Sequence, residues 1–324
     1  MTDAVLGIDV SKKTLDTSIR VGGKLRSRRF VNSPDGWRQL ICWLSAQKIR
    51  RLHACLEATG RYSLGVALAL HQAGHVVSIV NPAQIRDFTR TKLGRNKTDG
   101  VDAVHIREYA EVFKPLPWTP PSPALRRLGE LQTIRASLVA GLTEWKNRNG
   151  SGIVDETARS LAEATILHFT TQLQAIDRAI TETIEGNPGL RGKWELLLSI
   201  SGVGEILAGI LLAELPGPDV LRSSAEVVAY AGLNPRRHQS GTSVDRPTRI
   251  SKVGNAVLRA ALFMPAMSAM RHNPVVAALA ARLKIQGRLK GKQIVVAAMR
   301  KLLVLCFGVL KSGKRFDPAI ATAA

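Results

Sequence analysis

Apolar and polar positions follow two different periods along the first 114 residues. Short apolar or alternating runs predict five strands, at 4–11, 15–21, 24–31, 52–57 and 75–82. Apolar residues three and four apart predict three helices, at 33–46, 63–72 and 101–113. We therefore expect an α/β domain in which three early strands form a meander and crossovers join the rest.

This order of strands and helices is that of a ribonuclease H-like fold. A proline-rich segment ends it: residues 115–123 contain five prolines in nine positions, which neither a helix nor a central strand tolerates. We expect a domain boundary there, and assign residues 1–120 to the α/β domain.

Helical patterns follow the proline-rich segment, at 125–148 and 157–185. The second has a narrow apolar seam suited to a helical hairpin or short coiled coil, and it fits either a plain core stripe or an oligomerisation seam. The seam consists of Ile166, Phe169, Leu173, Ile176 and Ile180. We treat 121–192 as a helical or coiled-coil region.

From residue 193 we expect a third, mainly α domain, spanning 193–324. The run LSISGVGE at 198–205 resembles the hairpin of a helix-hairpin-helix element, with Gly202 and Gly204 as candidates for contacts to a nucleic-acid phosphate. A simple turn between two helices is the alternative. A second glycine-rich stretch covers 231–243 and is read as loop.

The net positive charge of the chain indicates the class of molecule that it binds. The chain has 46 Lys and Arg against 25 Asp and Glu, a formal net charge of +21, and a pI of about 10.7. From Val220 onward there are 18 Lys and Arg against three Asp and Glu, so this part alone carries +15. Such a surface attracts polyanions, and nucleic acid is the expected partner. A membrane-surface protein is disfavoured, because no lipidation motif or lone basic amphipathic helix is present.

Cysteine usage and the absence of a signal point to a compartment. The three cysteines form no C-x-x-C pair, and we find no secretory signal and no apolar run of about 18 residues. We expect a cytoplasmic, reduced, soluble protein that does not bind a membrane.

Four acidic residues are the candidates for a catalytic metal site. Asp9 lies near the end of the first strand and Glu57 ends the fourth, while Asp99 and Asp102 lie three residues apart where the last helix of the domain begins. Converging carboxylates hold the two divalent cations that in-line displacement at a phosphate requires. The predicted cofactor is Mg²⁺ at a two-metal site, with Mn²⁺ as the alternative ion.

Each acid also has a plain structural explanation. Glu57 alone is typical of a solvated strand end, and the pair at 99 and 102 is typical of a helix first turn. Three further acids, Asp16, Asp35 and Asp87, fit solvated strand, cap or turn positions, and we assign them no role.

The ordered motifs carry a family resemblance over nearly the whole chain. GIDVSK, LEATG and KTDGVDA, followed by SISGVG, AYAGLNP, QSG and ISKVGN, closely resemble the DEDD transposases of bacterial insertion sequences (insertion-sequence family one-ten), also called bridge-RNA-guided recombinases. The resemblance implies a RuvC-like, resolvase-type N-terminal domain with Asp9, Glu57, Asp99 and Asp102 as the acidic tetrad. It further implies a C-terminal transposase domain with Ser240 of QSG as nucleophile, and a structured guide RNA that pairs with donor and target DNA.

Ser240 lies in a basic context. A serine hydroxyl needs a base, a metal or positive surroundings to act as a nucleophile, and Arg236, Arg237 and His238 precede it. Thr242 and Ser243 are rival hydroxyls. His238 fits a base, a phosphate contact or a solvated loop residue.

The leading hypothesis is an RNA-guided recombinase that cuts, exchanges and rejoins DNA through a phosphoserine. Besides the tetrad and Ser240, we expect Arg236, Arg237 and Lys252 to bind nucleic acid. Strand exchange needs several active sites, so a dimer or tetramer is expected. The alternatives are a metal-dependent structure-specific endonuclease that uses water, and a nucleic-acid-binding protein without activity.

Overall fold

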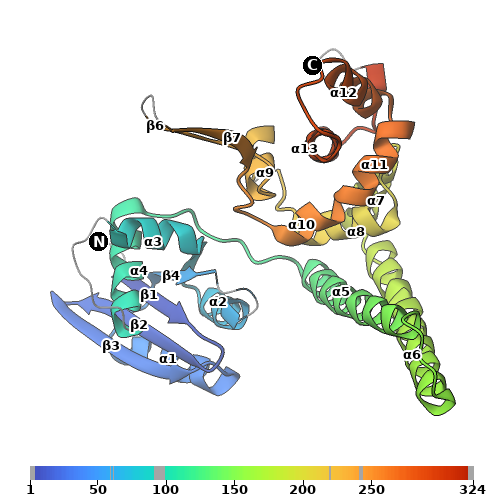
Figure 1. The fold of residues 1–324 in the computed structure, drawn as a ribbon. Helices are drawn as coiled ribbons and strands as arrows, with labels where there is room; N and C mark the ends of the chain where they lie inside the picture. The colour runs from blue at the N-terminus through green and yellow to red at the C-terminus, as the bar shows by residue number, and fades with distance from the viewer. Residues whose placement is uncertain are drawn as a thin grey trace. The chain divides into compact units, whose positions relative to one another are not determined.

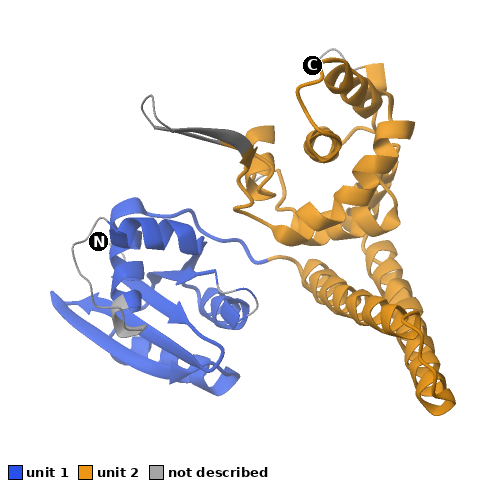
Figure 2. Cartoon of the chain, in the orientation of Figure 1, with its two compact units in different colours: residues 1–120 blue, residues 121–324 orange. Residues whose placement is uncertain are grey.

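The computed structural model divides the chain into two compact units, residues 1–120 and 121–324 (Figure 2). It describes residues 4–58, 60, 62–90, 99–218, 220–240 and 244–319, without the side chains of 99–101, 237–240 and 244–248. The three-domain division expected from the sequence stays a prediction.

Unit 1 is built on a five-stranded mixed sheet with strand order β3-β2-β1-β4-β5 (Figure 1). The strands are β1 (Ala4–Val10), β2 (Thr14–Val21), β3 (Lys24–Val31), β4 (Leu52–Glu57) and β5 (Val76–Val80). β1, β2 and β3 pair antiparallel, whereas β4 and β5 run parallel to β1. The predicted meander followed by crossovers is confirmed.

Helices cover both faces of this sheet, as strand alternation requires. One face packs on α1 (Pro34–Ala46) and α2 (Tyr62–Gln72), through a core that includes Leu6, Ile8 and Leu40. The other face packs on α3 (Pro82–Arg90) and α4 (Asp99–Phe113). Odd-numbered positions of β1 therefore face α4 and even-numbered positions face α1 and α2.

Helix α3 was not predicted. It is nine residues long and buries one side chain, Ile85, so its apolar pattern is too short to recognise. Proline opens it at Pro82, where the missing N–H is no loss, and the Asn81 side chain accepts a hydrogen bond from the backbone N–H of Ala83 (2.8 Å).

The proline-rich segment leaves unit 1 in an extended form beside β5. The backbone N–H of Trp118 donates to the carbonyl oxygen of Val77 (2.7 Å), and Ser78 Oγ donates to the carbonyl oxygen of Leu116 (2.8 Å). Ser122 then caps α5, and Pro123 opens that helix. The predicted break in regular structure is confirmed.

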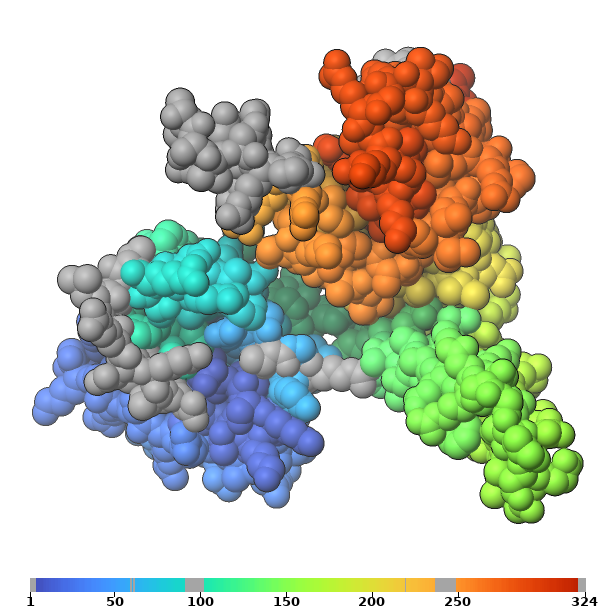
Figure 3. All heavy atoms as spheres, viewed as in Figure 1, coloured from blue at the N-terminus to red at the C-terminus, as the bar shows by residue number. Residues whose placement is uncertain are grey.

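Two long antiparallel helices, α5 (Pro123–Asn149) and α6 (Glu156–Glu185), form an arm of unit 2 (Figures 1 and 3). They approach closely at Gly141, where an added Cβ would lie 2.8 Å from the Phe169 ring. An ion pair between Arg135 Nε and Asp177 Oδ1 (2.6 Å) crosses the arm. Within the seam, Phe169 thus packs against α5 and Ile180 joins the core of unit 2, while the choice between a core stripe and an oligomerisation seam stays open.

The base of the arm merges into the core of unit 2, which joins Leu128 and Ile180 to the later helices. These are α7 (Pro188–Leu198), α8 (Glu205–Glu214), α9 (Ser224–Tyr230), α10 (Ala256–Ala261), α11 (Phe263–His272), α12 (Pro274–Ile285) and α13 (Gly291–Ser312). Within the described residues, α13 is the one helix long and apolar enough to cross a membrane. Half of its most apolar window is buried, because α13 supplies this core.

A two-stranded hairpin interrupts the helices: β6 (Pro235–Ser240) pairs antiparallel with β7 (Val244–Ile250). We expected residues 231–243 to be loop, which is wrong for the part that forms β6. Strand patterns are recognised by alternating apolar positions, and PRRHQS and VDRPTRI contain few apolar residues.

Candidate active site

Two of the predicted acids lie at the ends of neighbouring strands: Asp9 is the last residue but one of β1, and Glu57 ends β4. Register pairs Gly7 with Cys55 and Ile8 with Leu56, and one further step places Asp9 beside Glu57. Alternation puts both on the face of Gly7 and Cys55, toward α4. Adjacent strands lie about 4.8 Å apart, so the two carboxylates leave the sheet side by side.

Helix α4 runs antiparallel to β1 on this face. Val5 packs with a cluster that includes Ile106, whereas Gly7 meets the helix at Ala103 and Arg107. Positions further along β1, toward its C-terminal end, therefore face residues nearer the start of α4. Asp9, two residues beyond Gly7, faces the first turn of α4.

That first turn carries the other two acids. Asp102 is partly buried, and Asp99 is the first residue of the helix, with a side chain outside the described set. The approach of α4 depends on Gly7, since a Cβ there would lie 2.2 Å from the Ala103 carbonyl oxygen. The motifs GIDVS and KTDGVDA are thus joined by one glycine contact.

One more acid belongs to this neighbourhood, and the sequence analysis placed it wrongly. Asp16 was expected to be solvated, yet it is 9% exposed and lies directly opposite Asp9 in the β1–β2 ladder. Arg29 of β3 pairs with it, Nε to Oδ1, at 2.8 Å. The pairing could not be read locally, because it depends on the register of two hairpins.

The donor set fits a divalent cation chemically, because carboxylate oxygens are its preferred ligands. Among the side chains that the structure describes, which exclude Asp99, no three acids, histidines or cysteines form a metal cluster. Burial raises the pKa of the Cys55 thiol, two residues before Glu57, to about 12.

Ser240 belongs to unit 2, at the end of β6, where its backbone pairs with Val244. Its side chain, and those of Arg237 and His238, lie outside the described set, as do Thr242 and Ser243 entirely. Ser240 is thus a strand-end residue, where we expected a loop. Its role as nucleophile stays a prediction.

The hairpin is strongly basic. Arg236 and Arg249 lie directly opposite one another in the ladder, and both are exposed. Like charges at directly opposed positions destabilise a sheet unless an anion lies between them. This position therefore suits a phosphate. Lys252, also exposed, follows β7 with a positive φ of 55°.

The motifs AYAGLNP and ISKVGN are hydrogen-bonded to each other at the base of this hairpin. The backbone N–H of Asn255 donates to the Tyr230 carbonyl oxygen (2.7 Å), and Asn255 Nδ2 donates to Glu214 (2.8 Å). Gly254 has a φ of 138°, and a Cβ there would lie 2.3 Å from that same carbonyl. Burial is the main cause that raises the pKa of the Tyr230 hydroxyl.

The turn between α7 and α8 gives its glycines different roles. Gly202 has a φ of 99°, and a Cβ there would lie 2.7 Å from the Ala269 side chain, so packing explains this glycine. Gly204 is the exposed N-cap of α8, without a side-chain cap. Glu205 follows it and places a negative charge at that helix start. Phosphate contact by either glycine stays a prediction.

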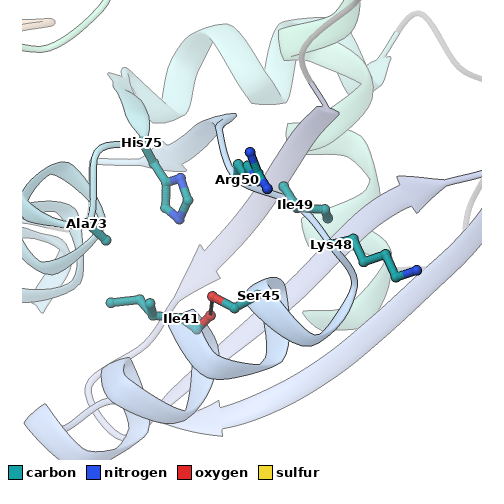
Figure 4. Close-up of a pocket in the computed structure, with 7 residues that line it drawn as sticks. All are labelled: Ile41, Ser45, Lys48, Ile49, Arg50, Ala73 and His75. Carbon is teal, nitrogen blue, oxygen red and sulfur yellow. Dashed lines mark hydrogen bonds between the residues drawn. The ribbon is translucent and has the colours of Figure 1, made fainter.

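A separate cavity of about 420 Å³ lies at the opposite edge of the sheet, where β4 and β5 begin (Figure 4). The ring of His75 points into it, and Lys48 and Arg50 belong to its lining. His75 is 7% exposed, and burial lowers the pKa of its ring. The cavity is remote from Asp9 and Glu57, which lie at the ends of their strands at the other edge.

Two family models match most of the chain. Residues 6–155 match a family model described as a DEDD transposase of the IS110 type. Residues 194–281 match a model described as "Transposase IS116/IS110/IS902 family".

Two relatives and one solved structure extend these matches. The pilin gene-inverting protein of Moraxella bovis is 31% identical over 99% of both chains. An IS110 protein of 43.6 kDa from Streptomyces coelicolor is 28% identical over 52% of this chain and 40% of its own. Thermus thermophilus RuvC bound to a Holliday junction is 17% identical over 36% of this chain and 99% of its own, with a TM-score of 0.27.

The family matches define the class: a transposase, an enzyme that acts on DNA. The full-length similarity to the gene-inverting protein then identifies the chain as a member of the IS110 family of transposases.

Proposed function

We propose that this transposase cuts and rejoins DNA through a phosphoserine on Ser240, assisted by Asp9, Glu57, Asp99 and Asp102. The observation that carries the proposal is the arrangement in unit 1: two acids at adjacent strand ends, facing the first turn of α4. When bound by these oxygens, Mg²⁺ ions, or Mn²⁺, would neutralise charge that builds on the phosphate oxygens.

The proposed chemistry balances without an energy source. The Ser240 hydroxyl loses its proton, its oxygen bonds to phosphorus, and the bond from phosphorus to the leaving sugar oxygen breaks. The leaving oxygen takes up a proton. Rejoining is the reverse step with a different sugar hydroxyl, so the phosphodiester energy is kept in the serine ester. Positive surroundings favour the serine oxyanion. The hairpin is basic, although its exposed pair Arg236 and Arg249 lies at the opposite end of the ladder from Ser240.

We propose donor and target DNA as substrates, selected by a structured guide RNA that pairs with both. The charge of +15 beyond Val220 supports a nucleic-acid surface there. Contacts to phosphates position nucleic acid but do not read its sequence, which leaves that task to base pairing. A homo-oligomer, a dimer or tetramer, would supply the several active sites that strand exchange needs.

The name of the Moraxella relative describes inversion of a pilin gene. Inversion and transposition use the same steps of cleavage, exchange and rejoining, and differ in how the DNA sites are arranged. The proposed chemistry covers both outcomes.

The deciding experiment separates a serine nucleophile from water. End-labelled DNA carrying the element ends is trapped during reaction with the complete protein and RNA complex, then run on a denaturing gel. We expect a covalent protein–DNA adduct that maps to Ser240 and disappears in Ser240→Ala. Ser243→Ala is the matched control and should keep both cleavage and adduct.

Three outcomes would change the proposal. Cleavage by Ser240→Ala without any adduct would favour the metal-dependent endonuclease that uses water. An adduct on Ser243 would keep the mechanism and move the residue. Normal cleavage by both Asp9→Asn and Asp102→Asn would refute the role of the acids.

The guide RNA has its own test. Protein treated with ribonuclease should bind DNA yet fail to recombine the element ends, and adding back the RNA that co-purifies should restore activity. Efficient site-specific recombination by RNA-free protein would contradict the guided mechanism.

A further inference from the structure

A row of charged side chains crosses four strands of unit 1 on the face that α4 covers. In the strand ladders, Arg29 lies opposite Asp16, and Asp16 lies opposite Asp9. Continuing the β1–β4 ladder by one residue places Asp9 opposite Glu57. The row therefore reads Arg29, Asp16, Asp9, Glu57 from β3 to β4. Strands are about 4.8 Å apart, so Arg29 stands on the order of 10 Å from Asp9.

Asp16 and Arg29 differ sharply in exposure. The Asp16 side chain is 12% exposed and the Arg29 side chain 58%, although their atoms lie 2.8 Å apart. An exposed arginine alone samples many rotamers, whereas a buried carboxylate on Nε restricts this one. The pair thus orients a guanidinium whose side chain stays more than half exposed.

The pair also solves an electrostatic problem at the site. Asp16 and Asp9 are directly opposed, and two carboxylates in such positions repel each other. Arg29 compensates Asp16, so the charge of the Asp9 site is not doubled. The exposed Lys12 and Lys13 in the β1–β2 turn add cations at the same end of the strands.

We propose that Arg29 binds a backbone phosphate of the DNA strand being cut, next to the scissile phosphate, and that Asp16 is the residue that positions it. The inference rests on the proposed function of Asp9 and Glu57. Arginine suits this task because its planar fork can hold a carboxylate through one edge and a phosphate through another.

The test compares variants of the complete protein and RNA complex on a plasmid that carries the element ends. Cleavage rate is measured against DNA concentration and, separately, against Mg²⁺ concentration. Arg29→Gln should raise the half-saturating DNA concentration roughly tenfold to a hundredfold, since it removes charged hydrogen bonds, and should leave the Mg²⁺ requirement unchanged. Arg29→Lys should recover part of the loss, because the charge remains without the fork.

Arg26→Gln is the matched control. Arg26 is exposed on the same strand, but it pairs with Ile19 and belongs to the face opposite α4. The Arg26→Gln substitution removes one positive charge from the strand and should leave cleavage unchanged. Asp16→Asn should shift the DNA dependence in the same direction as Arg29→Gln, by less, and should add nothing in the Arg29→Gln background.

The outcomes separate this inference from the function on which it rests. Normal cleavage by Asp9→Asn would remove the proposed function itself. If Asp9→Asn is inactive but Arg29→Gln matches Arg26→Gln, this inference alone fails. It also fails if Asp16→Asn and Arg29→Gln lower only the unfolding temperature, or if Asp16→Asn alone changes the Mg²⁺ requirement, which would make Asp16 a ligand.

Discussion

Replacing Gly7 with alanine is expected to separate the acids without removing any of them. A Cβ at Gly7 would lie 2.2 Å from the carbonyl oxygen of Ala103 and 2.4 Å from the backbone nitrogen of Arg107. Ordinary contact begins at 3.4 Å. Both atoms belong to the α4 backbone, so no side-chain rotation relieves the overlap, and the helix must move off β1 by about 1 Å.

The displacement has two expected costs. Overpacking of this kind lowers the free energy of unfolding by about 1–3 kcal/mol. The movement also takes Asp102, on α4, away from Asp9, on β1. Because misplacement of a reacting group by about 1 Å can cost on the order of a hundredfold in rate, cleavage should fall by that factor. Binding of nucleic acid should hold, since no cation is removed.

The assay pairs urea unfolding followed by circular dichroism with single-turnover DNA cleavage by the complete protein and RNA complex. Gly129→Ala is the control: a Cβ there meets nothing within 4 Å in α5, so it should stabilise by about 0.5–1 kcal/mol and leave cleavage unchanged. A Gly7→Ala protein with native stability and rate would refute the close approach of α4. Lost stability with a normal rate would refute the link between that approach and the acids.

Three further predictions concern burial. In the native protein at pH 8, a maleimide should label the exposed Cys42 but not the buried Cys55 or Cys306, and all three cysteines should react in denaturant. Burial raises the pKa of the Cys306 thiol to about 12, which makes its reactive thiolate roughly a thousandfold scarcer. Asn273→Ala should lower the unfolding free energy by about 2–4 kcal/mol, because this buried residue caps α12 and holds the Ser201 carbonyl oxygen; a loss under 1 kcal/mol in urea unfolding would contradict this. Burial lowers the pKa of His75 below 6.5, so the unfolded state binds the imidazole proton more tightly than the folded state, and the free energy of unfolding should decrease as pH falls through 6.5. The His75→Leu variant should lose that part of the pH dependence, and an unchanged pH profile would contradict this role of His75.

Hydrophobic period predicted most of unit 1, because four of its five strands have several buried apolar residues, whereas β3 buries only Phe30. The strand ends at Asp9 and Glu57 followed from this, and so did the shared helix turn of Asp99 and Asp102. The proline-rich break at 115–123 was equally local, since proline limits its own backbone. The patterns failed where few residues are apolar, in α3 and in the β6–β7 hairpin.

Sequence alone determined which residues are acidic, which faces are apolar and, through ordered motifs, the transposase family. Tertiary structure decided which of them meet. The row from Arg29 to Glu57 depends on the registers of three strand pairs, and the approach of α4 depends on a missing side chain at Gly7. Register and close packing join positions far apart in the chain, so no local pattern contains them.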